Sequence, residues 1–340
     1  MRSIRNPACD NRDRMEKPVP SKFPRVSVVM AVRNDATHIE ATLNAVLGQD
    51  YPGEIEVVVA DGRSTDGTSA ILLRRAAKEP RLRVVDNPDQ SAAAGLNRAI
   101  ASSKGAVVVR CDGHSELSSD YVRLAVEILG QTGAANVGGR QFAKGTTFLE
   151  RAVAIAMTTP FGVGNARFRY SSVPGPTDTV YLGTFPRDVL EEVGGFDTDL
   201  LRNQDYELNY RLRRAGRIVW FDPRLRVTYR PRSSLGALWR QYLDYGRWKR
   251  VMLMRNPGSL VARQTAPPLL VIGLILSALA GVIGIPFWWL VPASYATFLG
   301  IATITVSIHR RDGAVCLLPI VIPTMHLAWG TGFLLLRTRR

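Results

Sequence analysis

The chain has 340 residues, 46% of them hydrophobic, and a formal net charge of +15 at pH 7. This composition excludes a collagen, a small disulfide-stabilised protein and a fully disordered chain. The excess of Lys and Arg indicates a polyanionic partner or an anionic membrane surface. A membrane protein is not excluded, because averages over the whole chain conceal segments of unlike composition.

Residues 1–24 are expected to form a flexible tail, since the segment is rich in Arg and Pro and lacks the apolar stretch of a signal peptide. The basic charge is concentrated further along the chain. Residues 26–201 hold 17 basic and 21 acidic side chains, whereas residues 202–263 hold 15 and 4, a net charge of +11. The three cysteines lie in three unlike environments, which argues against a disulfide framework.

Short apolar runs alternate with helical patterns in the segment that follows the tail. Strands are predicted at residues 26–32, 55–60, 82–85 and 106–109, and helices at 36–47, 66–78, 91–101 and 118–129. This order implies a parallel sheet with helices on both faces. Residues 25–232 are therefore predicted to form an α/β domain, with its ligands beyond the carboxyl ends of the strands.

Three polar turns follow three of these strands, at residues 33–35, 61–68 and 110–114. Asp and Asn are common in ordinary turns, but three such turns at one edge favour a binding site. Asp112 and His114 would point the same way from an extended backbone, and a carboxylate with an imidazole suits Mn²⁺ better than Mg²⁺. An unliganded polar loop is the alternative. A dinucleotide or P-loop site is excluded, because neither glycine-rich motif is present.

Five motifs in this order resemble those of family 2 glycosyltransferases with the GT-A fold, across roughly residues 24–250. They are Val28-Val29-Met30-Ala31-Val32-Arg33-Asn34, Val59-Ala60-Asp61-Gly62-Arg63-Ser64-Thr65-Asp66-Gly67-Thr68, Asp112-Gly113-His114, Val193-Gly194-Gly195-Phe196-Asp197 and Arg202-Asn203-Gln204-Asp205-Tyr206-Glu207-Leu208. The Asp-Gly-His motif with a hydrophobic tail is most similar to succinoglycan-type exopolysaccharide glucosyltransferases. The resemblance implies a Rossmann-like mixed sheet and a nucleotide-sugar donor.

The same resemblance implies roles for individual residues. Asp61 would hydrogen-bond the nucleobase, uracil, with Asn34 in the same pocket. Asp112 and His114 stand where the family has Asp-x-Asp and would hold a divalent cation, Mn²⁺ or Mg²⁺, on the donor diphosphate. The further residues assigned to the donor are Ala31, Arg33, Arg63 and Arg247. Ala31 replaces the family's usual Pro, and His114 replaces its second Asp, which puts the identity of the metal in question.

Asp205 matches the acidic base of the family's Glu-Asp pair, with Gln204 in place of the Glu. From the residues alone, Asn203 can cap a helix that continues through Leu208 and Leu212. Asp205 would then lie in the first turn, where the helix dipole favours the carboxylate that a base requires. The alternative is a plain acidic residue at a helix N-terminus. As base, Asp205 would deprotonate an acceptor hydroxyl for a single inverting displacement.

Residues 233–263 are expected to form an amphipathic helix region at the membrane interface, with packing against the α/β domain as a compatible alternative. Leu238, Tyr242 and Tyr245 recur at helical spacing, while Arg240 and Arg247 lie on another face. The pair of Gln241 and Arg247-Trp248 resembles the Gln-x-x-Arg-Trp element of processive synthases, but with five intervening residues instead of two. The residues assigned to the acceptor or the membrane interface are Gln204, Gln241 and Trp248.

Residues 264–340 are predicted to form a transmembrane domain. They contain three hydrophobic segments, at about 267–285, 288–308 and 314–336, and Gly284-Ile285-Pro286 breaks the first from the second. A pair of buried soluble helices is the alternative. Three crossings would place the last arginines on the outer side, against the positive-inside rule, so Pro319 and Pro323 mark the third segment as a candidate re-entrant segment.

The sequence predicts a multi-pass protein of the cell membrane with its catalytic domain in the cytoplasm. Its expected activity is inverting transfer of a sugar, glucose, from a UDP-linked donor to a hydroxyl of a lipid-linked or polysaccharide acceptor. Two alternatives remain open: a polyprenyl-phosphate sugar synthase, and a non-catalytic membrane subunit that binds a nucleotide sugar. Nucleic acid is not expected as a partner, because no nucleic-acid-binding module is visible. The oligomeric state is not predicted.

Overall fold

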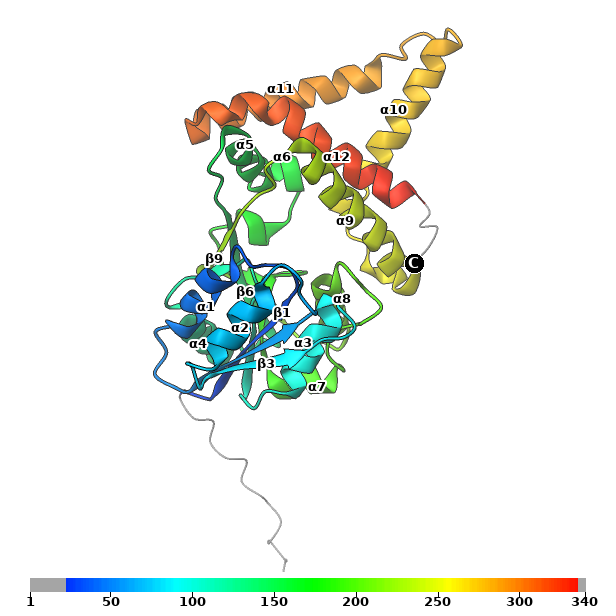
Figure 1. Ribbon diagram of the computed structural model, residues 1–340. Coiled ribbons are helices and arrows are strands. Elements are labelled where there is room, and N and C mark those ends of the chain that lie inside the picture. Colours follow the sequence, from blue (N-terminus) through cyan, green and yellow to red (C-terminus); the bar gives the residue numbers. More distant parts are fainter. Residues whose placement is uncertain (1–22, 336–340) are drawn as a thin grey trace, which may run out of the picture.

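The computed structural model describes residues 23–335. All but two residues of the predicted flexible tail therefore lie outside the described residues, as do the last five residues of the chain. The described part consists of an α/β domain and a set of long C-terminal helices that extends from one end of it (Figure 1).

The α/β domain is built on one nine-stranded sheet with the order β3-β2-β1-β4-β8-β6-β9-β5, and β7 pairs with β9. The strands are β1 (Val26–Val32), β2 (Ile55–Asp61), β3 (Leu82–Asp86), β4 (Val107–Arg110), β5 (Glu116–Leu117), β6 (Asn136–Ala143), β7 (Gly175–Pro176), β8 (Tyr181–Pro186) and β9 (Val219–Tyr229). Strands β1 to β4 are parallel, as the sequence predicts. The sheet as a whole is mixed, because β8 runs antiparallel to both β4 and β6.

Helices cover both faces of this sheet. They are α1 (Ile39–Leu47), α2 (Thr68–Ala76), α3 (Ala92–Ala101), α4 (Tyr121–Thr132), α7 (Arg187–Glu192) and α8 (Gln204–Arg214). Helices α5 (Phe148–Met157) and α6 (Pro160–Val163) pack instead against the C-terminal helices. Side chains of α1, α2 and α4 bury one face of the sheet, and side chains of α3, α7 and α8 bury the other. The near-continuous apolar strands β1 and β2 are the consequence, since both of their faces are covered.

Two predicted helix starts differ in detail from the structure. Helix α2 begins at Thr68, and Asp66 accepts hydrogen bonds from the Thr68 amide and hydroxyl instead of capping a helix that begins with it. Asn203 precedes α8 in a left-handed conformation and makes no side-chain cap, while Asp205 does lie in the first turn.

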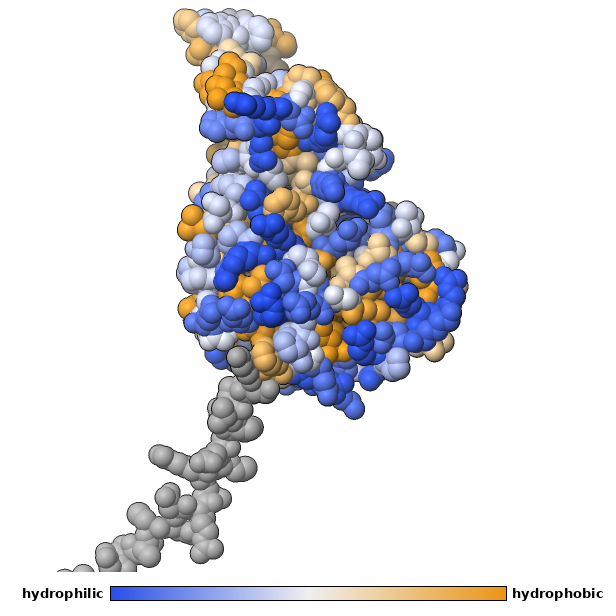
Figure 2. All heavy atoms as spheres, turned by 90° about the vertical axis from the view of Figure 1, so that its left-hand side faces the viewer, coloured by the Kyte–Doolittle hydropathy of each residue, from blue (hydrophilic) through white to orange (hydrophobic). Residues whose placement is uncertain are grey.

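The C-terminal part comprises α9 (Leu235–Arg255), α10 (Ala266–Val282), α11 (Leu290–Arg310) and α12 (Leu318–Leu334). The 3₁₀ turns η2 (Pro257–Ser259), η3 (Ala262–Gln264) and η4 (Gly313–Leu317) lie between these helices, and η1 (Arg167–Arg169) lies in the α/β domain. Three segments of the described chain are long and apolar enough to cross a membrane: Ala262–Val282, Leu290–Arg310 and Gly313–Leu334. Helix α10 leads away from the α/β domain and α11 returns towards it (Figure 1). In Figure 2 these helices form the narrow upper end of the molecule. Hydrophobic residues surround a group of hydrophilic residues there.

Helix α12 differs from the other two, because it packs along α9 and is a continuous helix through Pro323 (Figure 1). Two glycines allow this close approach. A Cβ atom at Gly246 would overlap the Trp329 carbonyl oxygen, and a Cβ atom at Gly332 would overlap the Leu243 carbonyl oxygen. Small residues at a helix crossing let two backbones approach in the same way inside membranes. The third of the candidate membrane helices is thus packed directly on α9, the helix that follows the α/β domain.

Candidate functional site

The first two polar turns at the carboxyl edge of the sheet are joined by hydrogen bonds. The Asn34 amide donates to Ser64 Oγ at 3.0 Å, and the Thr65 amide donates to Asn34 Oδ1 at 2.9 Å. Asn34 has a φ of 55°, a left-handed conformation that Asn tolerates better than most residues. Asp61 accepts from the Ser64 hydroxyl at 2.6 Å and from the Ser69 hydroxyl. Both residues therefore shape the turn into which the predicted nucleobase would fit.

Three further residues predicted to bind the donor lie around the same turns. Ala31 is half-buried near the end of β1, and Arg33 packs against Gly62. Arg63 forms an ion pair with Asp86 at 3.2 Å, and both side chains are exposed. The structure therefore places the residues of this group at one edge of the sheet.

Asp112 and His114 follow β4, and a third residue, Asp35, lies beside them. His114 Nδ1 is 3.6 Å from Asp35 Oδ2. Its hydrogen bond to Asp35, together with the charge of Asp112, raises the pKa of His114 above its usual range. Among the described residues, three or more His, Cys, Asp or Glu side chains do not gather anywhere in a metal-binding group. This part of the protein thus offers a cation one carboxylate and one imidazole from the predicted pair.

Arg110 connects this carboxylate to Asp205. The Arg110 side chain is almost fully buried, donates to Asp112 Oδ1 at 2.9 Å, and forms an ion pair with Asp205 Oδ1. Its guanidinium also lies 5.7 Å from the centre of the Phe196 ring. Burial acts to raise the pKa of Asp112, but the charges of Arg110, His114 and Arg202 outweigh burial and lower it. The two carboxylates predicted for metal binding and catalysis are therefore held on one guanidinium.

A cavity of about 620 Å³ contains both carboxylates. At its polar end lie Arg110, Asp112, Gln204 and Asp205, so the predicted acceptor residue Gln204 is brought to the predicted base. The opposite end is lined by apolar side chains of α6, α10, α11 and α12, which are Phe161, Leu270, Phe298, Met325 and Trp329. The cavity therefore extends from the sheet edge to the candidate membrane helices.

Three predicted residues of α9 do not line this cavity. Gln241 donates hydrogen bonds to Tyr229 and Tyr245, and Trp248 is buried. Arg247 is partly exposed and lies 3.7 Å from Asp244. Their assignments to the donor and the acceptor remain predictions.

The sequence did not assign most residues of the cavity to the site, among them Arg110, Arg169, Arg202 and Tyr242. Arg110 is the last residue of β4 and stands two positions before Asp112. This nearness to a recognised motif is the signal in the sequence that could have identified Arg110 as a site residue. Arg169 lies in η1, in a stretch for which the sequence predicts no element. Tyr242 was recognised only as a residue of the apolar face of α9.

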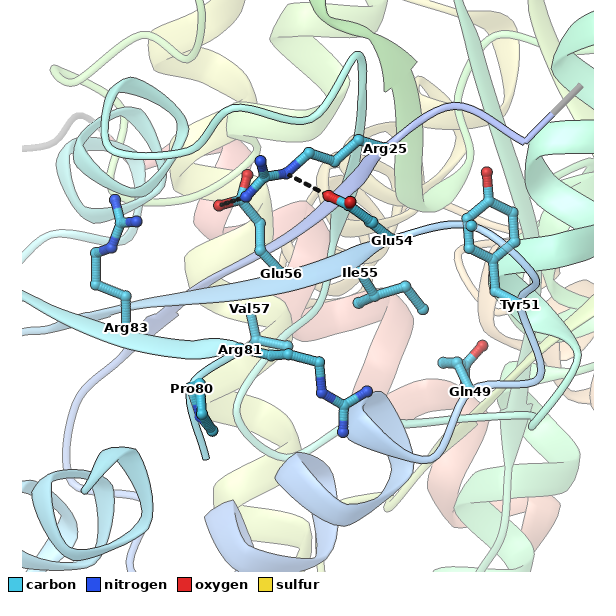
Figure 3. A pocket seen from close by; sticks show the side chains of 11 residues that line it. Arg25, Gln49, Tyr51, Glu54, Ile55, Glu56, Val57, Pro80, Arg81 and Arg83 are labelled. Atoms are coloured by element: carbon cyan, nitrogen blue, oxygen red, sulfur yellow. Dashed lines mark hydrogen bonds and ion pairs between the residues drawn. The ribbon is translucent and has the colours of Figure 1, made fainter. Parts of the chain in front are cut away.

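A second cavity, of about 380 Å³, lies at the opposite, amino end of β1 and β2. Figure 3 shows Arg25 directed towards Glu54 and Glu56, to which it is ion-paired at 3.8 and 3.2 Å. Arg81 of the same cavity pairs with Glu79 at 2.9 Å. The carboxylates already satisfy these charges, so the first cavity is the candidate site.

Comparison with known proteins assigns this architecture to a family. Residues 27–194 match the model of Glycosyl transferase family 2. The succinoglycan biosynthesis protein ExoA of Rhizobium meliloti (strain 1021) is 31% identical over 312 residues, which are 90% of this chain and 93% of that protein.

The chain belongs to glycosyl transferase family 2.

A more distant relative of this glycosyltransferase is the dolichyl N-acetyl-α-D-glucosaminyl phosphate 3-β-D-2,3-diacetamido-2,3-dideoxy-β-D-glucuronosyltransferase of Methanococcus voltae. It is 24% identical over 68% of this chain and 74% of its own length. The structure also resembles that of the mannosyltransferase PcManGT from Pyrobaculum calidifontis, which was solved in complex with GDP-Man and Mn²⁺. The TM-score is 0.61 at 20% sequence identity, and the match covers 92% of this chain and 90% of that one. The predicted GT-A fold of the glycosyltransferase is confirmed by this likeness.

Proposed function

We propose that this glycosyltransferase is attached to the membrane and transfers glucose from UDP-glucose to a hydroxyl of a lipid-linked acceptor, with inversion at the anomeric carbon. The observation that carries the proposal is the continuity of one cavity. Asp112 and Asp205 lie at its polar end, and side chains of α10, α11 and α12 line its apolar end. An acceptor with a sugar at one end and a lipid at the other matches this distribution of lining residues.

The donor would bind across the carboxyl edge of the sheet. Asp61 and Asn34 would receive the base, with Ala31, Arg33 and Arg63 around it, and the diphosphate would lie towards Asp112. Arg247 is a further donor candidate, on a helix that starts beside the same domain. Ligands of open α/β sheets bind at this edge, which supports the assignment.

A divalent cation, Mn²⁺ or Mg²⁺, would be held by Asp112 and His114. The donor set fits such an ion, because these cations commonly keep few protein ligands and take the rest from substrate phosphates and water. The Mn²⁺ named with PcManGT supports a metal in this chain as well. When bound, the cation would neutralise charge on the departing diphosphate.

Asp205 would act as the general base. Its Oδ1 is engaged by Arg110, which orients the carboxylate and leaves Oδ2 for the acceptor hydroxyl. As the acceptor oxygen forms its bond to the anomeric carbon, its proton passes to Asp205. The bond between that carbon and the β-phosphate oxygen breaks, and the nucleoside diphosphate leaves with the electron pair. One displacement of this kind inverts an α-linked donor to a β-linked product.

Replacing Asp205 by Asn tests the base, because the amide keeps the shape of the side chain and cannot accept the proton. We expect transfer to fall by about 100-fold or more, with the affinity for UDP unchanged. Transfer of labelled glucose to extracted lipid and calorimetric titration with UDP measure the two quantities. Asp199, which is exposed and lies in the preceding loop, provides the matched control, Asp199→Asn. A purified Asp205→Asn protein that retains more than about a tenth of wild-type turnover contradicts the assignment.

The structure of the lipid product separates this function from its nearest rival. A polyprenyl-phosphate sugar synthase uses a phosphate that is already ionised, so it would produce a sugar phosphodiester and would tolerate Asp205→Asn. The proposed enzyme lengthens a glycan by one glycosidic bond. Mass spectrometry with mild acid hydrolysis distinguishes the two products. Nucleotide binding without any transfer would instead indicate a non-catalytic subunit.

The catalytic domain would lie in the cytoplasm, with the basic segment 202–263 next to the anionic inner surface of the cell membrane. Labelling of single cysteines introduced at exposed positions of the α/β domain, in intact and in opened cells, tests this orientation. Labelling by an impermeant reagent in intact cells would overturn it.

A further inference from the structure

Arg169 and Arg202 form no ion pair with a carboxylate among residues 23–335. Both line the cavity, whose described lining holds four arginines and two carboxylates. Arg110 pairs with Asp112 and Asp205, and Arg263 pairs with Asp178. Arg169 donates to the neutral Gln141 at 2.7 Å, and no carboxylate of residues 23–335 pairs with Arg169 or Arg202. Two guanidinium groups are therefore available for an anion.

Both guanidinium groups line the cavity together with two tyrosines of α9, Tyr242 and Tyr245. Burial raises the pKa of the Tyr245 hydroxyl, and the charges of both Arg169 and Arg202 act on it in the opposite direction. Arg169 acts on the Tyr242 hydroxyl in the same way, and the rings of Tyr242 and Tyr245 are 5.6 Å apart. The side chain of Asn203, the residue after Arg202, donates to the Tyr245 carbonyl at 3.3 Å, so Arg202 and the tyrosines of α9 border the same part of the cavity.

Tyr242 supplies an unused hydrogen-bond donor at this position. Its side chain lines the cavity and is only 7% exposed, and its hydroxyl finds no partner among the described residues. A buried hydroxyl without a partner costs about 1–3 kcal/mol, so such groups are normally satisfied by a protein group, water or a ligand. In a cavity that also contains two guanidinium groups without a carboxylate partner, this hydroxyl can donate a hydrogen bond to an oxygen of a phosphate.

The apolar end of the cavity begins next to these three groups. Phe161 and Phe298 are in edge-to-face contact, with ring centres 5.8 Å apart, and Leu270 and Trp329 belong to helices that can cross a membrane. Water gains little from such a lining, whereas a hydrocarbon chain is stabilised by contact with it. The arrangement of an anion site followed by apolar walls fits an amphiphile.

We propose that Arg169, Arg202 and Tyr242 bind the phosphate of a lipid phosphate, whose hydrocarbon chain enters between α10, α11 and α12. The site deepens the proposed function, on which it rests, because it identifies the acceptor as a glycan linked to its lipid through phosphate. The phosphate would lie on the membrane side of Asp205, so that the acceptor sugar is directed towards the base.

Binding of farnesyl phosphate to the full-length protein in detergent micelles tests the site. Farnesol has the same chain without the phosphate, and inorganic phosphate has the charge without the chain. We expect farnesyl phosphate to bind with an affinity about tenfold or more above that of either compound, as measured by competition with a fluorescent analogue of farnesyl phosphate. Equal affinity for farnesol and farnesyl phosphate would overturn the proposal.

Variants locate the bound molecule. Arg169→Gln and Arg202→Gln should each weaken binding of farnesyl phosphate by about tenfold, and Tyr242→Phe by a smaller factor, with UDP affinity unchanged in Arg169→Gln and Tyr242→Phe. Leu270→Trp should weaken farnesyl phosphate and farnesol alike by filling the apolar end. Arg240→Gln is the matched control, because Arg240 is an exposed arginine of α9 that lies outside the cavity. Unchanged farnesyl phosphate affinity in both arginine variants, or loss of UDP affinity instead, contradicts the assignment.

Binding and transfer can fail separately. Farnesyl phosphate binding that depends on Arg169 supports the site even where Asp205→Asn remains active and the proposed base is wrong. Conversely, a transferase that depends on Asp205 but binds farnesol and farnesyl phosphate equally retains its function and loses this phosphate site.

Discussion

Arg110 forms an ion pair with Asp205, and the same guanidinium holds Asp112 on its other side. A planar guanidinium can satisfy two carboxylates at once, which a single ammonium group cannot do with the same geometry. The relative position of Asp112 and Asp205 is consequently determined by one side chain at the end of β4. Phe196, which packs under the guanidinium, contributes to the orientation of that side chain.

Replacing Arg110 by Lys should separate the two carboxylates while keeping the charge. We expect kcat to fall by about 10- to 100-fold, because Asp205 loses its fixed orientation. Steady-state kinetics with saturating UDP-glucose measures the effect. Arg98→Lys is the control, since Arg98 pairs with Asp89 on the exposed surface and such pairs contribute about 1 kcal/mol or less. Wild-type turnover in the Arg110→Lys protein would show that the bridge is not needed.

Removing the metal should abolish transfer. Dialysis against EDTA is expected to eliminate activity and Mn²⁺ to restore it, because the diphosphate would otherwise leave without a counter-charge. In His114→Ala, the Mn²⁺ concentration for half-maximal activity should rise by about tenfold. His38, which lies 3.8 Å from the other oxygen of Asp35, gives the control His38→Ala. Full activity after exhaustive chelation would contradict a metal at Asp112 and His114.

Lys249 should make the stability of the protein depend on pH. The side chain is buried against the Tyr206 ring, and its Nζ donates a hydrogen bond to the Ser259 carbonyl at 2.6 Å. Burial lowers the pKa of Lys249 from 10.5 to about 7. The charge of Arg263 also lowers this pKa, whereas the charge of Asp178 raises it. Between these two pH values the unfolded chain binds a proton that the folded chain does not. The free energy of unfolding should therefore rise with pH from about 7 upwards and fall as pH returns to 7.

Thermal unfolding between pH 7 and 9.5 measures this dependence. In Lys249→Met the increase attributable to Lys249 should disappear, whereas replacement of the exposed Lys144 by Met should preserve it. Parallel pH profiles for the wild type and Lys249→Met would contradict the buried-lysine explanation.

Gly332→Ala should destabilise the contact between α9 and α12. The added Cβ would overlap the Leu243 carbonyl oxygen, so the two helices must move apart. We expect a lower melting temperature in detergent. Gly300→Ala in α11 meets no atom within 4 Å and should leave the melting temperature unchanged or raise it, since Ala favours helix over Gly. Equal effects of both changes would mean that the glycine contact does not determine the packing.

The first half of the sheet could be predicted because β1, β2 and β4 are buried on both faces and consist largely of apolar residues. The other half lacks this signal. Strand β6 contains Gly138 and Gly139 at a shift of register against β9, and β9 itself contains Asp222 and Pro223. Their pairing depends on contacts far apart in the sequence, so neither strand was predicted.

The candidate site shows the same division. Asp112, His114 and Asp205 could be identified because their motifs are local. The role of Arg110 depends on a partner 95 positions away, and the environment of Tyr242 depends on α12 packing beside α9. Periodicity predicted the helix of Tyr242 but did not reveal that its hydroxyl would face a cavity.

Helix α12 is bonded at both ends to elements of the catalytic side. Asp312, just before η4, lies 3.6 Å from Arg151 of α5, and Arg250 of α9 donates to the Leu334 carbonyl at 2.6 Å. We expect a helix anchored in this way to begin and finish on one side of a bilayer. The pair of α10 and α11 would then supply an even number of crossings, in agreement with the positive-inside rule.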